Sequence, residues 1–156
     1  MTDLALLHRL VGAWQTEATH PALPGVLVKG AVTCEWLEGE RFLIQRARAE
    51  HPDFPDSVSI IGVTERDRVG RSSDAAPAVT AEHLTMHYFD SRGVFRVYRV
   101  SVDEGALRVS RVAPGFSQRF TGTFADGGKT IYGKWQLCED DVHWQDDLEI
   151  VYRQNV

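Results

Sequence analysis

The sequence predicts an all-β protein: a closed up-and-down antiparallel β-barrel of about ten strands with a short N-terminal helix. After the first twelve residues the chain is a succession of runs rich in Val, Ile, Phe, Tyr, Trp and Thr, separated by turns that contain Gly, Asp or Pro. From residue 90 onward the turns recur about every 12 residues, which is typical of antiparallel hairpins. Such a series of strands has exposed edges unless the sheet closes, so a barrel is favoured and a β-sandwich is the alternative.

The individual elements follow from local patterns. Leu4, Leu7 and Leu10 are spaced as on one face of a helix, which we expect to end at Gly12. The predicted strands cover approximately residues 12–20, 27–37, 41–49, 57–65, 81–90, 93–103, 106–112, 116–125, 129–138 and 142–153. The segment 66–81 is poor in strand formers, so it is either a surface insertion or a lid over the barrel mouth.

Length, charge and cysteine content limit the kinds of protein that this chain can be. A length of 156 residues with 43% hydrophobic residues predicts one domain over residues 1–156. No apolar run reaches the ~20 residues of a membrane-spanning helix, and no signal peptide is recognisable, so we expect a cytoplasmic protein with no membrane partner. A net charge of -5 without a basic stripe argues against a nucleic-acid partner. Cys34 and Cys138 are too few for a disulfide framework or a Cys-rich metal site, so we expect reduced thiols and no metal.

Side-chain alternation indicates which residues face the barrel interior. Phe116, Phe120 and Phe124 alternate with polar residues and therefore define a buried face. Two-residue turns preserve this alternation from strand to strand, and a three-residue turn at residues 38–40 extends it towards the N-terminus. The polar residues that this reasoning places inside are Arg46, His87, Arg96, Tyr98, Arg111, Gln118, Asp146 and Tyr152.

An interior with several arginines implies a binding function. A buried guanidinium is costly unless it is paired, and Asp146 is the one acid that the alternation places inside. The surplus of positive charge indicates an anionic ligand or internal water. We expect a small, partly apolar, anionic ligand in the lumen, bound by the eight residues named above; the alternative is a structural or interaction domain whose barrel is filled by its own side chains. A single β-bulge would reverse the alternation and move such arginines into solvent. A homodimer is compatible with such a barrel.

Short motifs carry a family resemblance. The segment LVGAW, a short helix running into G-x-W at Gly12 and Trp14, resembles the signature of the calycin superfamily, which includes lipocalins, fatty-acid-binding proteins and nitrobindin-like barrels. The segments EWLEGERFLIQR, YFDSRGV and PGFSQRF extend the resemblance to a small bacterial family of this barrel type. In the superfamily a basic residue on the last strand packs over the G-x-W tryptophan, a role that the resemblance gives to Arg153.

The resemblance also suggests ligands. Arg96 and Tyr98 form an Arg-x-Tyr pair similar to the one with which fatty-acid-binding proteins hold a carboxylate. Nitrobindin-like barrels hold haem through a histidine on a late strand; His143 has that position but alternates outward, whereas His87 alternates inward on another strand. An isomerase-like or cyclase-like enzyme using His87 with Tyr98 or Asp146 is a further alternative, although no hydrolase, nucleotide-binding or metalloprotease motif is present.

Overall fold

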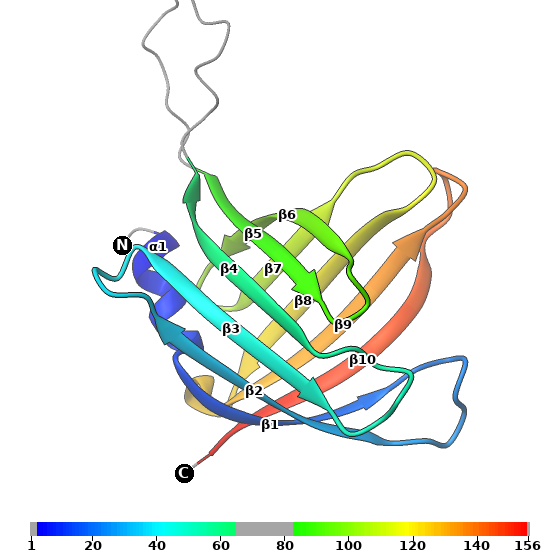
Figure 1. Ribbon diagram of the computed structural model, residues 1–156, viewed down its shortest axis with the longest axis horizontal. Helices are drawn as coiled ribbons and strands as arrows, with labels where there is room; N and C mark the ends of the chain where they lie inside the picture. The colour runs from blue at the N-terminus through cyan, green and yellow to red at the C-terminus, as the bar shows by residue number, and fades with distance from the viewer. Residues whose placement is uncertain (1–2, 65–82, 156) are drawn as a thin grey trace, which may run out of the picture.

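The chain forms a closed antiparallel barrel of ten strands (Figure 1). The computed structural model describes residues 3–64 and 83–155. The elements are the α-helix α1 (Asp3–Leu6), the 3-10 helices η1 (Leu7–Leu10) and η2 (Asp126–Gly128), and the strands β1 (Gly12–Thr19), β2 (Val28–Trp36), β3 (Phe42–Ala49), β4 (Ser57–Thr64), β5 (His83–Asp90), β6 (Phe95–Val102), β7 (Ala106–Arg111), β8 (Ser117–Ala125), β9 (Thr130–Cys138) and β10 (Gln145–Gln154). The predicted fold class is confirmed, and the β-sandwich alternative is wrong. The prediction for 66–81 lies outside the described residues.

The barrel closes because its first and last strands pair with each other. Each strand pairs with its sequence neighbours, and β1 pairs with β10 in antiparallel register, with Trp14 opposite Gln154. Beyond the last strand, the Asn155 backbone N–H donates to the Ala13 carbonyl at 2.8 Å. The described strands therefore present no free edge, which is the state that removes the unpaired donors and acceptors of an open sheet.

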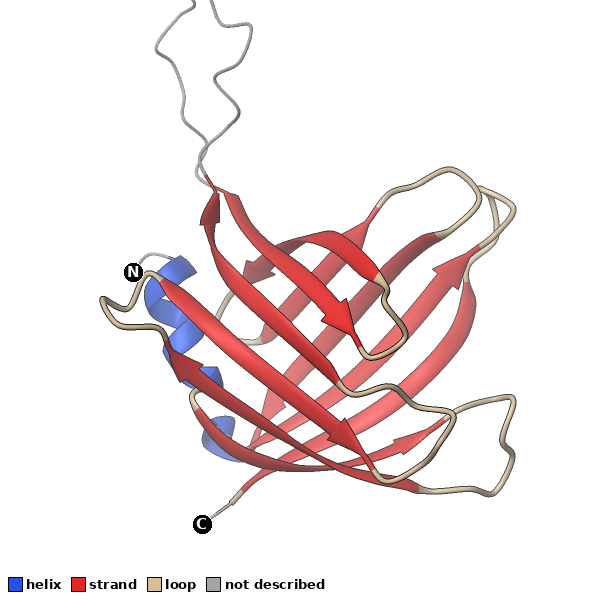
Figure 2. Ribbon diagram, viewed as in Figure 1, coloured by secondary structure: helices blue, strands red, loops and turns tan. Residues whose placement is uncertain are grey.

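The N-terminal helical turns cover one end of the barrel (Figure 2). Leu7 and Leu10 are 0% and 4% exposed, and the indole N–H of the buried Trp14 donates to the Leu10 carbonyl at 2.9 Å. Outside this core, the Arg9 guanidinium lies 3.9 Å from the centre of the Phe124 ring. Helices α1 and η1 have four residues each, and no helix in the described part of the chain is long and apolar enough to cross a membrane.

The predicted G-x-W signature is present in part. Gly12 has φ +132°, and a Cβ there would lie 2.7 Å from the Gln154 amide nitrogen, so the glycine permits close approach of β10. Arg153 does not pack over Trp14, and that expectation is wrong. Its neighbour Tyr152 faces inward, so Arg153 faces outward, where it pairs with Glu17 at 2.9 Å.

Candidate ligand-binding site in the barrel lumen

The lumen contains a cavity that opens at the end away from the helix. It has a volume of about 330 Å³ and continues into a deeper, mainly apolar space of about 60 Å³ beside Trp14 and Leu10. Both volumes together lie at the lower end of the range for small-molecule sites. Polar side chains that line the main cavity include Thr16, His20, Gln45, Ser57, Ser59, Tyr88, Arg92, Arg96, Tyr98, Gln118, Asp147 and Tyr152.

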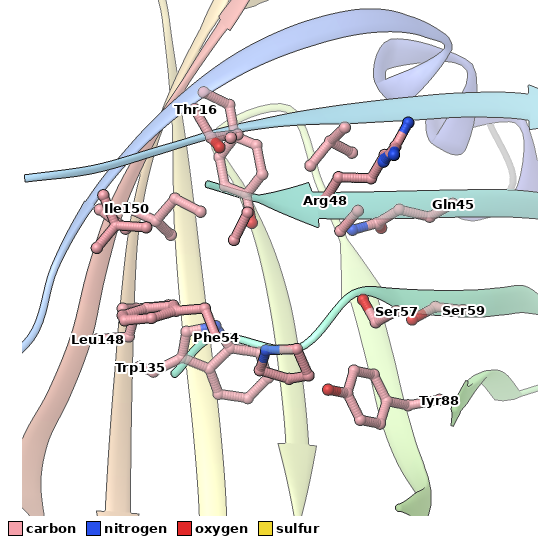
Figure 3. Close-up of a pocket in the computed structure, with 18 of the residues that line it drawn as sticks. Thr16, Gln45, Arg48, Phe54, Ser57, Ser59, Tyr88, Trp135, Leu148 and Ile150 are labelled. Atoms are coloured by element: carbon pink, nitrogen blue, oxygen red, sulfur yellow. The ribbon is translucent and has the colours of Figure 1, made fainter. Parts of the chain in front are cut away.

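Polar residues form a continuous row on one wall of the cavity. Gln45 of β3 lies opposite Ser59 of β4, Ser59 lies opposite Tyr88 of β5, and Tyr88 lies opposite Arg96 of β6. Alternation along each strand points all four side chains inward at one level of the barrel. Figure 3 shows Gln45, Ser57, Ser59 and Tyr88 on one side of the cavity and Trp135, Leu148 and Ile150 on the other. The cavity is therefore polar on one wall and apolar on the facing wall.

Arg96 is a guanidinium of this cavity that has no carboxylate partner among the described residues. Arg92 pairs with Asp90 at 2.7 Å, and Arg111 donates to the Phe116 carbonyl at 2.9 Å. Arg96 instead lies 5.1 Å from the centre of the Phe116 ring, and among the described residues it forms no ion pair with a carboxylate. Its positive charge therefore lines the lumen without an internal anion to compensate it.

The tyrosines of the lumen are hydrogen-bond donors at neutral pH. Burial raises the pKa of Tyr98, an effect that a hydrogen bond from Arg96 and the charge of Arg111 partly oppose. Burial also raises the pKa of Tyr152 well above its usual value of 10.0. The Tyr98 hydroxyl donates to Gln118 Oε1 at 2.9 Å, and both residues are buried. This bond fixes the Gln118 amide so that its nitrogen, a donor, is left for other partners.

Five of the eight predicted site residues face the interior: Arg96, Tyr98, Arg111, Gln118 and Tyr152. Their strands follow the predicted alternation because the turns between β6, β7, β8 and β9 preserve it. In the β6–β7 turn, for example, the Asp103 N–H donates to the Ala106 carbonyl, which leaves two residues between them. Arg111 is engaged by a backbone carbonyl, and the other four line the cavity.

His87 lies outside the barrel, and its predicted inward position is wrong. The Asp90 N–H donates to the Val94 carbonyl, so the β5–β6 turn has three residues instead of two. Gly93 adopts φ +85°, as expected for the last residue of such a turn. The extra residue reverses the alternation of β5, so Met86 and Tyr88 line the cavity. On the outer face the His87 ring stacks at 6.3 Å from Phe95.

Arg46 also faces outward, because the β2–β3 turn is longer than predicted. Leu37 N–H donates to the Phe42 carbonyl, so four residues, 38–41, form the turn and Trp36 lies opposite Leu43. Leu43 and Gln45 are therefore the inward residues, and Arg46 is exposed. The prediction that Arg46 lines the lumen is wrong, because the turn has one residue more than predicted.

Asp146 is displaced from the interior by a β-bulge between Asp146 and Glu149. Its carboxylate lies outside, 3.2 Å from Lys134 Nζ and 3.0 Å from Gln136 Nε2. The bulge turns Asp147 towards the cavity instead, where it lies 2.6 Å from His20 Nε2. Beyond the bulge the alternation returns to the predicted one, so Tyr152 faces the lumen.

Sequence reasoning missed Gln45, Ser59, Tyr88 and the pair of His20 and Asp147. The glycine at position 93 is the signal that could have located Tyr88, because a Gly in the third position of a hairpin turn is typical of three-residue turns. The pair at the mouth carried no such signal. His20 Nδ1 accepts from the Ala22 N–H at 3.0 Å while Nε2 donates to Asp147, so both ring nitrogens are engaged.

The histidines do not fit the haem and acid–base alternatives. His87 lies outside, and His143 is 78% exposed with Nδ1 2.6 Å from Asp140. His20, at the cavity mouth, has no free ring nitrogen. None of these three histidines is therefore positioned to ligate haem iron from inside the lumen. Among the described residues, no group of three or more His, Cys, Asp or Glu could hold a metal ion. The enzyme mechanism built on His87 and Asp146 is excluded by their outward positions.

The fold and the cavity together define a closed ten-stranded antiparallel β-barrel with a ligand-sized cavity at one end. The chain is similar in structure to Rv2717c from M. tuberculosis, whose crystal structure superposes with a TM-score of 0.64. That similarity covers 100% of this chain and 99% of the other at 12% sequence identity, so it supports the fold. No protein-family model and no curated protein matches the sequence.

Proposed function

We propose that the protein binds a small, partly apolar, anionic molecule in its lumen. The observation that carries the proposal is Arg96, which lines the cavity without a carboxylate partner among the described residues. An unpaired guanidinium in a partly desolvated cavity is costly, and an anion bound beside it offsets that cost. Tyr98 and Gln118 lie on neighbouring positions of the same wall and supply neutral hydrogen-bonding groups.

The apolar part of the ligand has a surface to pack against. Trp135, Leu148 and Ile150 line the wall opposite the polar row, and Phe54 contributes from the β3–β4 loop (Figure 3). Burying the apolar face of a ligand here is favourable at roughly 25 cal/mol per Å². Charge recognition at Arg96 and apolar packing against Trp135 together favour an organic anion over an inorganic one.

The test is a comparison of binding constants for biphenyl-4-carboxylate, measured by isothermal titration calorimetry. Replacing Arg96→Gln removes the charge but keeps a polar side chain, and we expect the dissociation constant to rise by about tenfold or more. Arg99→Gln is the matched control, because Arg99 is exposed on the same strand and lines a surface hollow on the outer face. We expect binding to the control variant within about twofold of the wild type. Equal effects of the two substitutions would refute the assignment of Arg96.

A further inference from the structure

Several polar groups that line the lumen have no hydrogen-bond partner among the described residues. Ser59 and Thr16 are 3% and 6% exposed, and within residues 3–64 and 83–155 neither hydroxyl forms a hydrogen bond. The Gln45 amide and the Tyr152 hydroxyl belong to partly buried side chains, and they also form no hydrogen bond within these residues. Buried polar groups in folded proteins are nearly always satisfied, and those that are not call for a bound water or ligand.

These groups lie away from the charge. Gln45 and Ser59 are at one end of the row that Arg96 closes at the other. Measured along the sheet, Gln45 is three strand spacings, about 14 Å, from Arg96, and Ser59 is two spacings, about 10 Å, away. Tyr88, between them, is engaged by Asp90 at 2.7 Å. A saturated fatty acid bound at Arg96 has no polar atom to offer Gln45 or Ser59, so it leaves both unsatisfied.

The shape of the cavity restricts the ligand further. One wall is polar along its length, and the facing wall presents the Trp135 indole with Leu148 and Ile150 (Figure 3). A planar ring has apolar faces and carries polar substituents at its edge, so it satisfies both walls at once. An alkyl chain satisfies the apolar wall alone.

We propose that the ligand is an aromatic acid that carries a second hydrogen-bonding group, such as a hydroxyl, at the end remote from its carboxylate. The carboxylate lies at Arg96, and the remote group exchanges hydrogen bonds with Gln45 and Ser59. This inference rests on the proposed function and adds the class of ligand. Thr16 and Tyr152, opposite each other on β1 and β10, are satisfied by a further substituent or by water.

The experiment compares three acids by calorimetry: 4'-hydroxybiphenyl-4-carboxylate, biphenyl-4-carboxylate and decanoate. We expect the hydroxylated acid to bind about tenfold or more tightly than its parent, and decanoate to bind more weakly than both. In a Gln45→Leu, Ser59→Ala double variant the two aromatic acids should bind within about twofold of each other. Ser59→Ala alone removes one buried oxygen and should reduce the preference in part.

Matched controls separate the two proposals. Ser110→Ala, on the outer face of β7, should retain the full preference for the hydroxylated acid. If the parent acid or decanoate binds as tightly as the hydroxylated acid, or if the preference survives in the double variant, the ligand class is wrong while Arg96-dependent anion binding stands. If none of the three acids binds the wild type, both proposals are wrong.

Discussion

The substitution Asp90→Asn should destabilise the protein and release Arg92 at the cavity mouth. The Asp90 side chain is 0% exposed, and its carboxylate accepts five hydrogen bonds. These come from the Tyr88 hydroxyl, from the backbone N–H groups of Arg92 and Val94, and from two nitrogens of the Arg92 guanidinium. An asparagine keeps one carbonyl oxygen for the backbone donors and turns an amide nitrogen, itself a donor, towards Arg92 or Tyr88.

The expected loss is about 2 kcal/mol in the free energy of unfolding. Removing a charged acceptor from a hydrogen-bonded pair costs roughly 1.5–3 kcal/mol. The lower part of that range applies because the Arg92 side chain is 55% exposed and regains water when the carboxylate is lost. For a domain of this size about 2 kcal/mol corresponds to a fall of about 4–8 °C in the melting temperature.

The assay is urea denaturation of wild type and variant over a range of pH. The Arg92 guanidinium is the main cause that holds the pKa of Asp90 below its usual 3.8. The stabilisation is therefore fully present above the unfolded pKa of 3.8 and is lost as the pH falls through the lower, folded value. We expect the difference between the two proteins to be constant from pH 8 to pH 5 and to shrink below about pH 4.

Asp103→Asn is the matched control in the β6–β7 turn. Asp103 also accepts backbone and arginine hydrogen bonds, but its side chain is 61% exposed, so its loss should cost less. An equal loss in both variants, or a difference between wild type and Asp90→Asn that varies between pH 8 and pH 5, would refute the reasoning.

Two further predictions concern packing and thiol chemistry. A Cβ at Gly133 would lie 2.6 Å from the buried Phe120 ring. Gly133→Ala should therefore lower the free energy of unfolding, measured in urea, by about 1–3 kcal/mol. A loss below about 0.5 kcal/mol would contradict this packing. Burial raises the pKa of the Cys34 thiol to about 12, and Cys138 is also buried. Neither thiol should react with Ellman's reagent at pH 8 until the protein is unfolded. Rapid labelling of Cys34 in the native protein would contradict its burial in the lumen.

The alternation of apolar and polar residues was sufficient to predict the strands and the closed barrel. In runs such as Phe116 to Phe124, buried and exposed residues alternate with a period of two, which differs from the 3.6-residue period of a helix. Glycine and aspartate mark the turns between such runs. These signals are local, so they can be read from the sequence without knowledge of tertiary contacts.

The orientation of side chains was predictable only where the turn length was. Arg96 and Gln118 lie on β6 and β8, and the turns that join β6, β7 and β8 preserve the alternation, so both inward positions were predicted correctly. His87, Arg46 and Asp146 each lie beyond a turn or bulge with one residue more than expected, and one residue reverses the face of an entire strand. The length of a turn depends on backbone hydrogen bonds such as Asp90 N–H to Val94 carbonyl, which composition alone does not reveal.

The pairing of β1 with β10 has a consequence for how the molecule folds. The two strands are separated by nearly the whole chain, so the pairing that runs from Trp14 opposite Gln154 to Thr19 opposite Glu149 closes the largest loop that the topology contains. The entropy lost in closing a loop grows with its length, and contacts of this kind slow folding. Until β10 leaves the ribosome, β1 and β9 each have one edge without a partner strand. The nascent sheet is then open, and the lumen is not yet enclosed.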